Sequence, residues 1–206
     1  MIVQTLALGP AQTNCYLVSA DSSREAVVID PGWDADAILA GARAAELTIE
    51  AILLTHGHFD HIGAVADLKD ALQVPLMAHV QEIDLLEAKG GADLFGFRIR
   101  SVPQPDQLVE HGEAIEIGSL KFEVRYVPGH TVGHVAFIEH HHQSAFVGDV
   151  LFAGSIGRTD LPGGDYDTLI ASIFDQLLTL PDDFKVYPGH GPPTTIGLER
   201  RTNPFL

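Results

Sequence analysis

Four short apolar segments in this sequence each run into a histidine or an aspartate, and this pattern restricts the fold more than any other feature. The first segment, Ala51–Leu54, precedes THGHFDH (residues 55–61), and the other three lead through a glycine to His130, Asp149 and His190. Short β-branched runs are typical of buried strands. Ligands at the carboxyl ends of neighbouring strands can converge on one crevice. The sequence therefore predicts one site built from seven side chains: His56, His58, Asp60, His61, His130, Asp149 and His190.

The types and number of these side chains indicate which ions they would bind. Imidazole and carboxylate groups suit zinc, iron and manganese, and no thiolate is present to make the site purely structural. Seven ligands are too many for one tetrahedral ion but suit two, with Asp149 as the bridge. We therefore expect two divalent ions per chain, zinc first, with iron or manganese as alternatives. The first ion is assigned His56, His58 and His130, and the second is assigned Asp60, His61 and His190.

The rest of the chain mixes strands with helices. Apolar runs predict strands over 2–8, 16–19, 26–29, 51–54, 76–78, 114–117, 121–127, 135–138, 145–147 and 185–187. Amphipathic stretches predict helices over 34–45, 63–71, 81–88 and 166–178, and a short final helix that closes at 199–201. This pattern in 206 residues favours a single α/β (α+β) domain, residues 1–206, built as a layered sandwich. The nucleotide-binding patterns GxGxxG and GxxxxGKS/T are absent.

Charge and composition exclude several classes of protein. The chain carries 12 Lys and Arg against 28 Asp and Glu, a formal net charge of −16, whereas a nucleic-acid-binding protein usually presents a basic stripe. No apolar run reaches the ~18 residues of a transmembrane helix, and the N-terminal segment lacks the basic start of a secretory signal. The single cysteine, Cys15, permits no intrachain disulfide. We therefore expect a cytoplasmic protein whose partner is a small molecule, and neither nucleic acid nor a membrane.

The motifs around the seven side chains resemble those of the metallo-β-lactamase superfamily of hydrolases. They are THGHFDHIG (55–63), PGHTVGH (128–134), GDVLF (148–152) and PGHG (188–191). Within the superfamily the chain is similar to short bacterial glyoxalase II-type proteins (hydroxyacylglutathione hydrolases), through GSIGRTD (154–160), GGDY (163–166) and ERRTNPFL (199–206). The resemblance implies a four-layer αββα sandwich with the metals at one edge between two sheets. It also implies hydrolysis of the thioester S-D-lactoylglutathione to D-lactate and glutathione.

The expected mechanism follows from two adjacent ions. They would hold a bridging hydroxide at neutral pH, because metal binding lowers the pKa of water to about 7. Asp60 is expected to bind the second ion and to orient this hydroxide, which attacks the thioester carbonyl while the ions stabilise the oxyanion and the leaving thiolate. No Ser or Cys nucleophile is needed, and Cys15 is predicted to be a small buried core residue.

Other polar positions have two interpretations each. His134 is predicted to be a buried partner of a ligand rather than a ligand. Arg158, together with Asp160, is predicted to orient the loop that carries Asp149, and the alternative is that Arg158 binds a substrate carboxylate. The run of histidines at 140–142 lies between two predicted strands, so an exposed hairpin turn is favoured over a metal relay.

Competing functions use the same residues differently. The main alternative is a persulfide dioxygenase, an oxidoreductase with similar motifs, which would hold one iron through His56, His130 and Asp149. A metal-binding protein without activity is a third reading, which the retention of all seven ligands disfavours. Three other functions are disfavoured. A class B β-lactamase would call for Cys or Ser where Asp149 stands, and a flavodiiron oxidase would normally have Glu at the His58 position. A nuclease would need a basic surface, whereas this chain is acidic. Metal content separates the first two functions: two metals indicate the hydrolase, and one iron with oxygen uptake indicates the dioxygenase.

Overall fold

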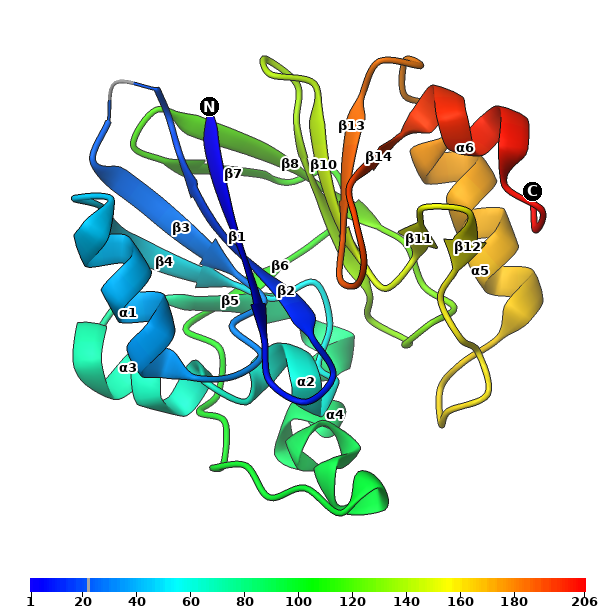
Figure 1. Ribbon diagram of the computed structural model, residues 1–206. Coiled ribbons are helices and arrows are strands. Elements are labelled where there is room, and N and C mark those ends of the chain that lie inside the picture. The colour runs from blue at the N-terminus through cyan, green and yellow to red at the C-terminus, as the bar shows by residue number, and fades with distance from the viewer. Residues whose placement is uncertain (22) are drawn as a thin grey trace. The chain divides into compact units, whose positions relative to one another are not determined.

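The computed structural model describes residues 1–21 and 23–206. Its residues group into two compact units (Figure 1). Unit 1 contains residues 1–109 and 116–120, and unit 2 contains residues 110–115 and 121–206. Among the described residues, no helix has the length and apolar character needed to cross a membrane.

Unit 1 is built on a six-stranded sheet whose strands follow one another in chain order. Its strands are β1 (Ile2–Leu8), β2 (Thr13–Ser19), β3 (Glu25–Ile29), β4 (Thr48–Leu53), β5 (Leu76–His79) and β6 (Gln107–Val109). The first three strands are antiparallel, and the strands from β3 to β6 are parallel. The parallel half therefore places the carboxyl ends of β3, β4 and β5 at one edge.

Helices of unit 1 connect the parallel strands (Figure 1). They are α1 (Ala35–Ala44), α2 (Phe59–Ile62), α3 (Val65–Leu72) and α4 (Ile83–Glu87), with 3₁₀ turns at Val80–Glu82 and Lys89–Phe95. Helix α1 begins at Asp34, whose side chain accepts a hydrogen bond from the Ala37 N–H and so satisfies a donor of the first turn. Fully buried Ile38 of α1 and Leu68 of α3 join Ile52 of β4 in the core, and each contributes roughly 1.5–3 kcal/mol.

Unit 2 carries the second six-stranded sheet, in the order β14-β13-β10-β9-β8-β7, apart from residues 116, 117 and 120 of β7 and β8, which group with unit 1. Its strands are β7 (Ala114–Ile117), β8 (Leu120–Tyr126), β9 (Val135–Glu139), β10 (Ser144–Gly148), β13 (Lys185–Pro188) and β14 (Thr194–Thr195), and β11 (Leu151–Phe152) and β12 (Ser155–Ile156) form a separate hairpin. Strands β10 and β13 are parallel, which places their carboxyl ends side by side. Helix α5 (Tyr166–Ser172), a π-helical turn (Ile173–Leu177) and α6 (Ile196–Thr202) complete the unit.

The predicted elements are largely confirmed, with one correction at the histidine motif. The sequence predicts a helix over 63–71, directly after the motif, but α2 begins at Phe59 and α3 begins at Val65. Asp60 and His61 therefore lie within a short helix, where an acidic side chain in the first turn is favourable. Strands β6, β11, β12 and β14 were not predicted, because each has only two or three residues, too few to show a periodicity.

Two smaller predictions are also confirmed. Residues 140–143 form the turn between β9 and β10, and His140 and His141 are exposed. In that turn His140 Nε2 lies 2.5 Å from a Glu123 carboxylate oxygen. Cys15 is fully buried in the core of unit 1, where burial, and then the nearby Asp30 carboxylate, raises the pKa of its thiol.

Candidate metal-binding residues

The unit 1 ligand group consists of four predicted ligands that follow strand β4: His56, His58, Asp60 and His61. The three imidazoles are buried. The centroid of the His56 ring lies 4.1 Å from that of His61 and 4.9 Å from that of His58. The turn after a parallel strand and the short helix α2 thus bring all four side chains to one edge of the sheet.

A buried carboxylate that the sequence interpretation missed holds this group in place. Asp30, at the end of β3, accepts hydrogen bonds from the Thr55 N–H (2.8 Å) and the Thr55 hydroxyl (2.6 Å). Its Oδ2 also lies 3.0 Å from His61 Nδ1. The available signal was the same as for the other sites: Asp30 directly follows a buried strand and precedes Pro31-Gly32.

These hydrogen bonds fix which nitrogen of His56 and of His61 can bind a metal. A carboxylate only accepts, so His61 Nδ1 carries the hydrogen that it donates to Asp30. The Thr55 hydroxyl gives its hydrogen to Asp30, so its oxygen accepts from His56 Nδ1 at 3.0 Å. Both rings therefore present Nε2 as the lone-pair nitrogen, the arrangement usual for a metal-binding histidine.

Asp30 could itself be taken for a ligand, because ligand-type atoms of Asp30, His56 and His61 lie within 4.8 Å of one another. Its oxygens, however, are engaged by Thr55 and by His61 Nδ1. We therefore assign Asp30 to support of the ligands rather than to the metal.

Asp60 is positioned by the backbone beneath it and by a threonine from β2. Thr13 Oγ1 donates to Asp60 Oδ2 at 2.9 Å. The same oxygen lies 3.8 Å from His61 Nε2. A Cβ at Gly32 would overlap the Asp60 carbonyl oxygen, so only glycine allows this approach.

The unit 2 ligand group consists of the other three predicted ligands: His130, Asp149 and His190. Asp149 and His190 follow the parallel neighbours β10 and β13, and His130 lies in the turn after β8. Asp149 Oδ2 is 3.6 Å from His130 Nε2 and 3.4 Å from His190 Nε2. One carboxylate oxygen thus faces two imidazole nitrogens. The bridging role of Asp149 stays a prediction.

Neutral groups support the unit 2 ligand group. His130 Nδ1 donates to the Arg158 carbonyl oxygen at 2.7 Å, which leaves Nε2 as its lone-pair nitrogen. Fully buried His134 accepts the Asp149 N–H through Nε2 at 3.1 Å, in agreement with its predicted role beside a ligand. A Cβ at Gly157 would overlap the Asp149 carbonyl oxygen, so this loop packs against the ligand strand as closely as backbone allows.

The side chain of Arg158 faces a different partner. It makes two hydrogen bonds of 2.7 Å to the Asp160 carboxylate, and both side chains are more than half exposed. The Arg158 guanidinium is the main cause that lowers the pKa of Asp160 to about 2. The pair ties residues 158–160 together, while the Arg158 backbone holds His130, which agrees with the predicted loop-orienting role.

The separations within the unit 2 ligand group suit a shared cation. Two atoms about 2.1 Å from one ion in tetrahedral geometry lie roughly 3.4 Å apart. The distances from Asp149 to its two histidines, 3.6 and 3.4 Å, are close to this value and exceed the ~2.7–3.2 Å of a hydrogen bond. His130 Nε2 faces the Asp149 carboxylate with a lone pair rather than an N–H, so the two groups repel each other. A cation between them would attract both.

Comparison with known proteins agrees with this chemistry. Residues 8–190 match the model of the Metallo-beta-lactamase superfamily. The chain is 41% identical over 209 aligned residues to the hydroxyacylglutathione hydrolase GloC of Haemophilus influenzae, and the match covers 100% of this chain and 98% of the relative.

Solved structures agree at the level of the fold. The B3 metallo-beta-lactamase BLEG-1 matches with a TM-score of 0.95 and 44% identity, over 100% of this chain and 99% of that chain. TTHA1623 in a di-iron-bound form matches with 0.91 and 46%, over 99% and 100%. ETHE1 from Myxococcus xanthus matches with 0.81 and 32%, over 99% and 84%. The predicted metallo-β-lactamase fold class is thereby confirmed.

The residues and the family agree. The chain has histidines and aspartates that could hold a metal ion, and its full-length relatives include a hydroxyacylglutathione hydrolase. The chain belongs to the Metallo-beta-lactamase superfamily and is an enzyme of the hydrolase class.

Proposed function

We propose that this protein is a dinuclear metal-dependent thioesterase that hydrolyses S-D-lactoylglutathione or a related glutathione thioester. One observation carries the proposal. In both ligand groups, an imidazole whose Nδ1 is committed to an acceptor presents its lone-pair Nε2 to a carboxylate oxygen, 3.6 Å away for His130 and 3.8 Å away for His61. Two such pairs are what two cation sites would require.

In this proposal residues 1–206 form a single domain that holds two metal ions. The match of one family model to residues 8–190, which span both units, supports a single domain. The first ion would be held by His56, His58 and His130, the second by Asp60, His61 and His190, and both by Asp149. Zinc suits these ligands, and the di-iron form of the similar TTHA1623 supports iron as an alternative.

When bound, two such ions supply an activated water and polarise the carbonyl that it attacks. The residues of the chain supply the orientation. Asp60, held by the Thr13 hydroxyl, accepts a hydrogen bond from the attacking water and directs it. Cys15 takes no part as a nucleophile, since its thiol is fully buried and its pKa is raised.

The choice of thioester is supported by the similarity to GloC over almost the full length of both chains. A carboxylate of the substrate would be a partner for the exposed Arg158 guanidinium, although the pairing with Asp160 favours the loop-orienting role. A cytoplasmic location stays a prediction.

The test is metal analysis and a thioester panel on the same preparation. We expect two metals per chain and hydrolysis of S-D-lactoylglutathione, followed as release of free thiol. Full metal loading without turnover of any acyl-glutathione would overturn the proposal.

The second candidate is the persulfide dioxygenase, and the 32% identity to ETHE1 is the observation that favours it. It would need one iron, held by His56, His130 and Asp149. One iron per chain, with oxygen uptake on a glutathione persulfide and no thioester hydrolysis, would establish this activity instead.

A further inference from the structure

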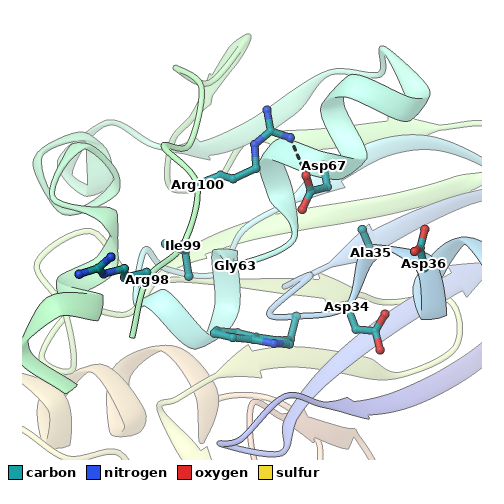
Figure 2. Close-up of a pocket in the computed structure, with 9 residues that line it drawn as sticks. Asp34, Ala35, Asp36, Gly63, Asp67, Arg98, Ile99 and Arg100 are labelled. Carbon is teal, nitrogen blue, oxygen red and sulfur yellow. Dashed lines mark hydrogen bonds and ion pairs between the residues drawn. The ribbon is translucent and has the colours of Figure 1, made fainter. Parts of the chain in front are cut away.

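Unit 1 contains a cavity that the proposed function does not use. Its volume is about 560 Å³, within the ~300–1,000 Å³ usual for small-molecule sites. It lies between the start of α1, the end of α2 and residues 98–100 (Figure 2), and its walls include Trp33, Asp34, Gly63 and Arg98.

None of the four side chains of the unit 1 ligand group is among the described residues that line the cavity. Gly63, in its wall, follows His61 by two positions. Two positions in an α-helix correspond to a rotation of about 200°, so the buried His61 ring and the cavity face away from each other. A molecule in this cavity would therefore occupy a site separate from the unit 1 ligand group.

The charges on the cavity wall are incompletely neutralised. Arg100 pairs with Asp67 at 2.5 Å and with Asp70 at 2.8 Å, and Figure 2 shows it turned toward Asp67. By contrast, Arg98 makes neither an ion pair nor a hydrogen bond with any residue that the structure describes.

Two further carboxylates lie on the opposite side of the cavity from Arg98. They belong to Asp34, which also caps α1, and to Asp36 in the first turn of that helix (Figure 2). The cavity thus offers a cation at one side and carboxylates at the other.

An aromatic ring with a fixed position completes the wall. Trp33 packs edge-on against Phe97, with ring centroids 5.8 Å apart, and Phe97 stacks on Phe59. A Cβ at Gly9 would lie 2.8 Å from the Trp33 side chain, so the indole is also held closely from the β1–β2 turn. Trp33 is therefore preorganised as an apolar surface for a ligand.

We propose that this cavity binds a small zwitterion of the α-amino acid class. The ligand carboxylate would pair with Arg98, its ammonium group with Asp34 and Asp36, and its apolar part would pack on Trp33. A ligand with both charges satisfies both sides of the wall, whereas an anion or a cation alone satisfies one. The proposal is independent of which thioester the metal centre hydrolyses.

The test uses the fluorescence of Trp33, which is the single tryptophan of the chain. L-phenylalanine is titrated alongside two matched compounds, 3-phenylpropanoate, which lacks the ammonium group, and 2-phenylethylamine, which lacks the carboxylate. We expect a saturable change with L-phenylalanine and roughly 10- to 100-fold weaker binding of the other two, the range for loss of one charge-assisted hydrogen bond.

Two variants then locate the carboxylate. Arg98→Met should weaken L-phenylalanine and 3-phenylpropanoate by a similar factor and leave 2-phenylethylamine unchanged. Arg24→Met is the matched control, because Arg24 is exposed and pairs with Glu46 outside the cavity. No saturable change with L-phenylalanine, equal binding of all three compounds, or equal behaviour of the two variants would each overturn the proposal.

Discussion

The two ligand groups reach similar geometry in opposite ways. The unit 1 group comes from one continuous segment, residues 56–61, whereas the unit 2 group comes from three turns spread over residues 130–190. In unit 1 the support is a buried carboxylate, Asp30, which serves Thr55 and His61 together. In unit 2 the support comes from a backbone carbonyl and a neutral imidazole.

This difference predicts which substitutions would disturb each ligand group. Asp30 orients His61 directly and His56 through Thr55, so its loss should affect two ligands of the unit 1 group at once. The unit 2 group depends on strand register and on loop packing, which no single polar side chain controls. Hydrogen bonds to a charged group are also worth more than those between neutral groups, about 1.5–3 against 0.5–1.5 kcal/mol.

The largest effect is expected at the residue that joins the unit 2 group. Asp149→Ala removes the only carboxylate that faces both His130 and His190 among the three members of that group. We expect nearly complete loss of thioesterase activity and less than one metal per chain, measured by elemental analysis. Asp183→Ala, which removes an exposed carboxylate of the same unit, is the control. Full metal occupancy in Asp149→Ala would contradict the bridging role.

A pair of support variants compares the two groups directly. Asp30→Asn keeps the shape but removes the charge that orients His61 and Thr55, and a loss of roughly 10- to 100-fold in metal affinity is expected. His134→Asn removes a neutral acceptor of the Asp149 N–H, and the loss should be smaller. Competition with a chelator measures both. Equal losses of metal affinity in the two variants would show that the charge of the supporting side chain does not matter.

Glycine variants test how closely each group is packed. A Cβ at residue 32 or 157 would overlap a ligand carbonyl oxygen, so Gly32→Ala and Gly157→Ala should each destabilise by about 1–3 kcal/mol. Thermal unfolding should show decreases in Tm of roughly 2–12 °C. Gly41→Ala is the control, since this glycine lies inside α1, where alanine has the higher helix propensity. A decrease at only one of the two sites would show that the groups are packed to different tightness.

The smallest effect is expected at the exposed pair beside the unit 2 group. The pKa of Asp160 is lowered to about 2, chiefly by Arg158, from the ~3.9 of an unfolded aspartate. A lowered folded-state pKa contributes stability above pH ~4 that is lost as the pH falls toward 2. Asp160→Asn should therefore differ slightly from the wild type in Tm at pH 7 and match it near pH 2. A difference that persists at pH 2 would have another origin.

The seven candidate ligands could be singled out in the sequence because each one follows a predicted strand. Each strand is visible as an apolar run that leads into a histidine or an aspartate, in three of the four cases through a glycine. The supports were harder to predict. Asp30 was missed although it follows a strand, because a single aspartate before Pro-Gly equally suits an ordinary turn. The role of the Arg158 backbone carbonyl could not be predicted from the sequence, because every residue has a backbone carbonyl.

The family, the strands and helices with recognisable periodicity, and the seven candidate ligands could all be predicted from the sequence alone. The tertiary structure was needed to show that Asp60 and His61 lie in a helix. It was also needed to show which nitrogen His56, His61 and His130 present and which polar groups hold these rings. The physical reason is how far apart the interacting residues lie along the chain. Periodicity and motif spacing are properties of neighbours in the chain, whereas the hydrogen bond from His130 to residue 158 and the one between Asp30 and His61 join residues 28 and 31 positions apart.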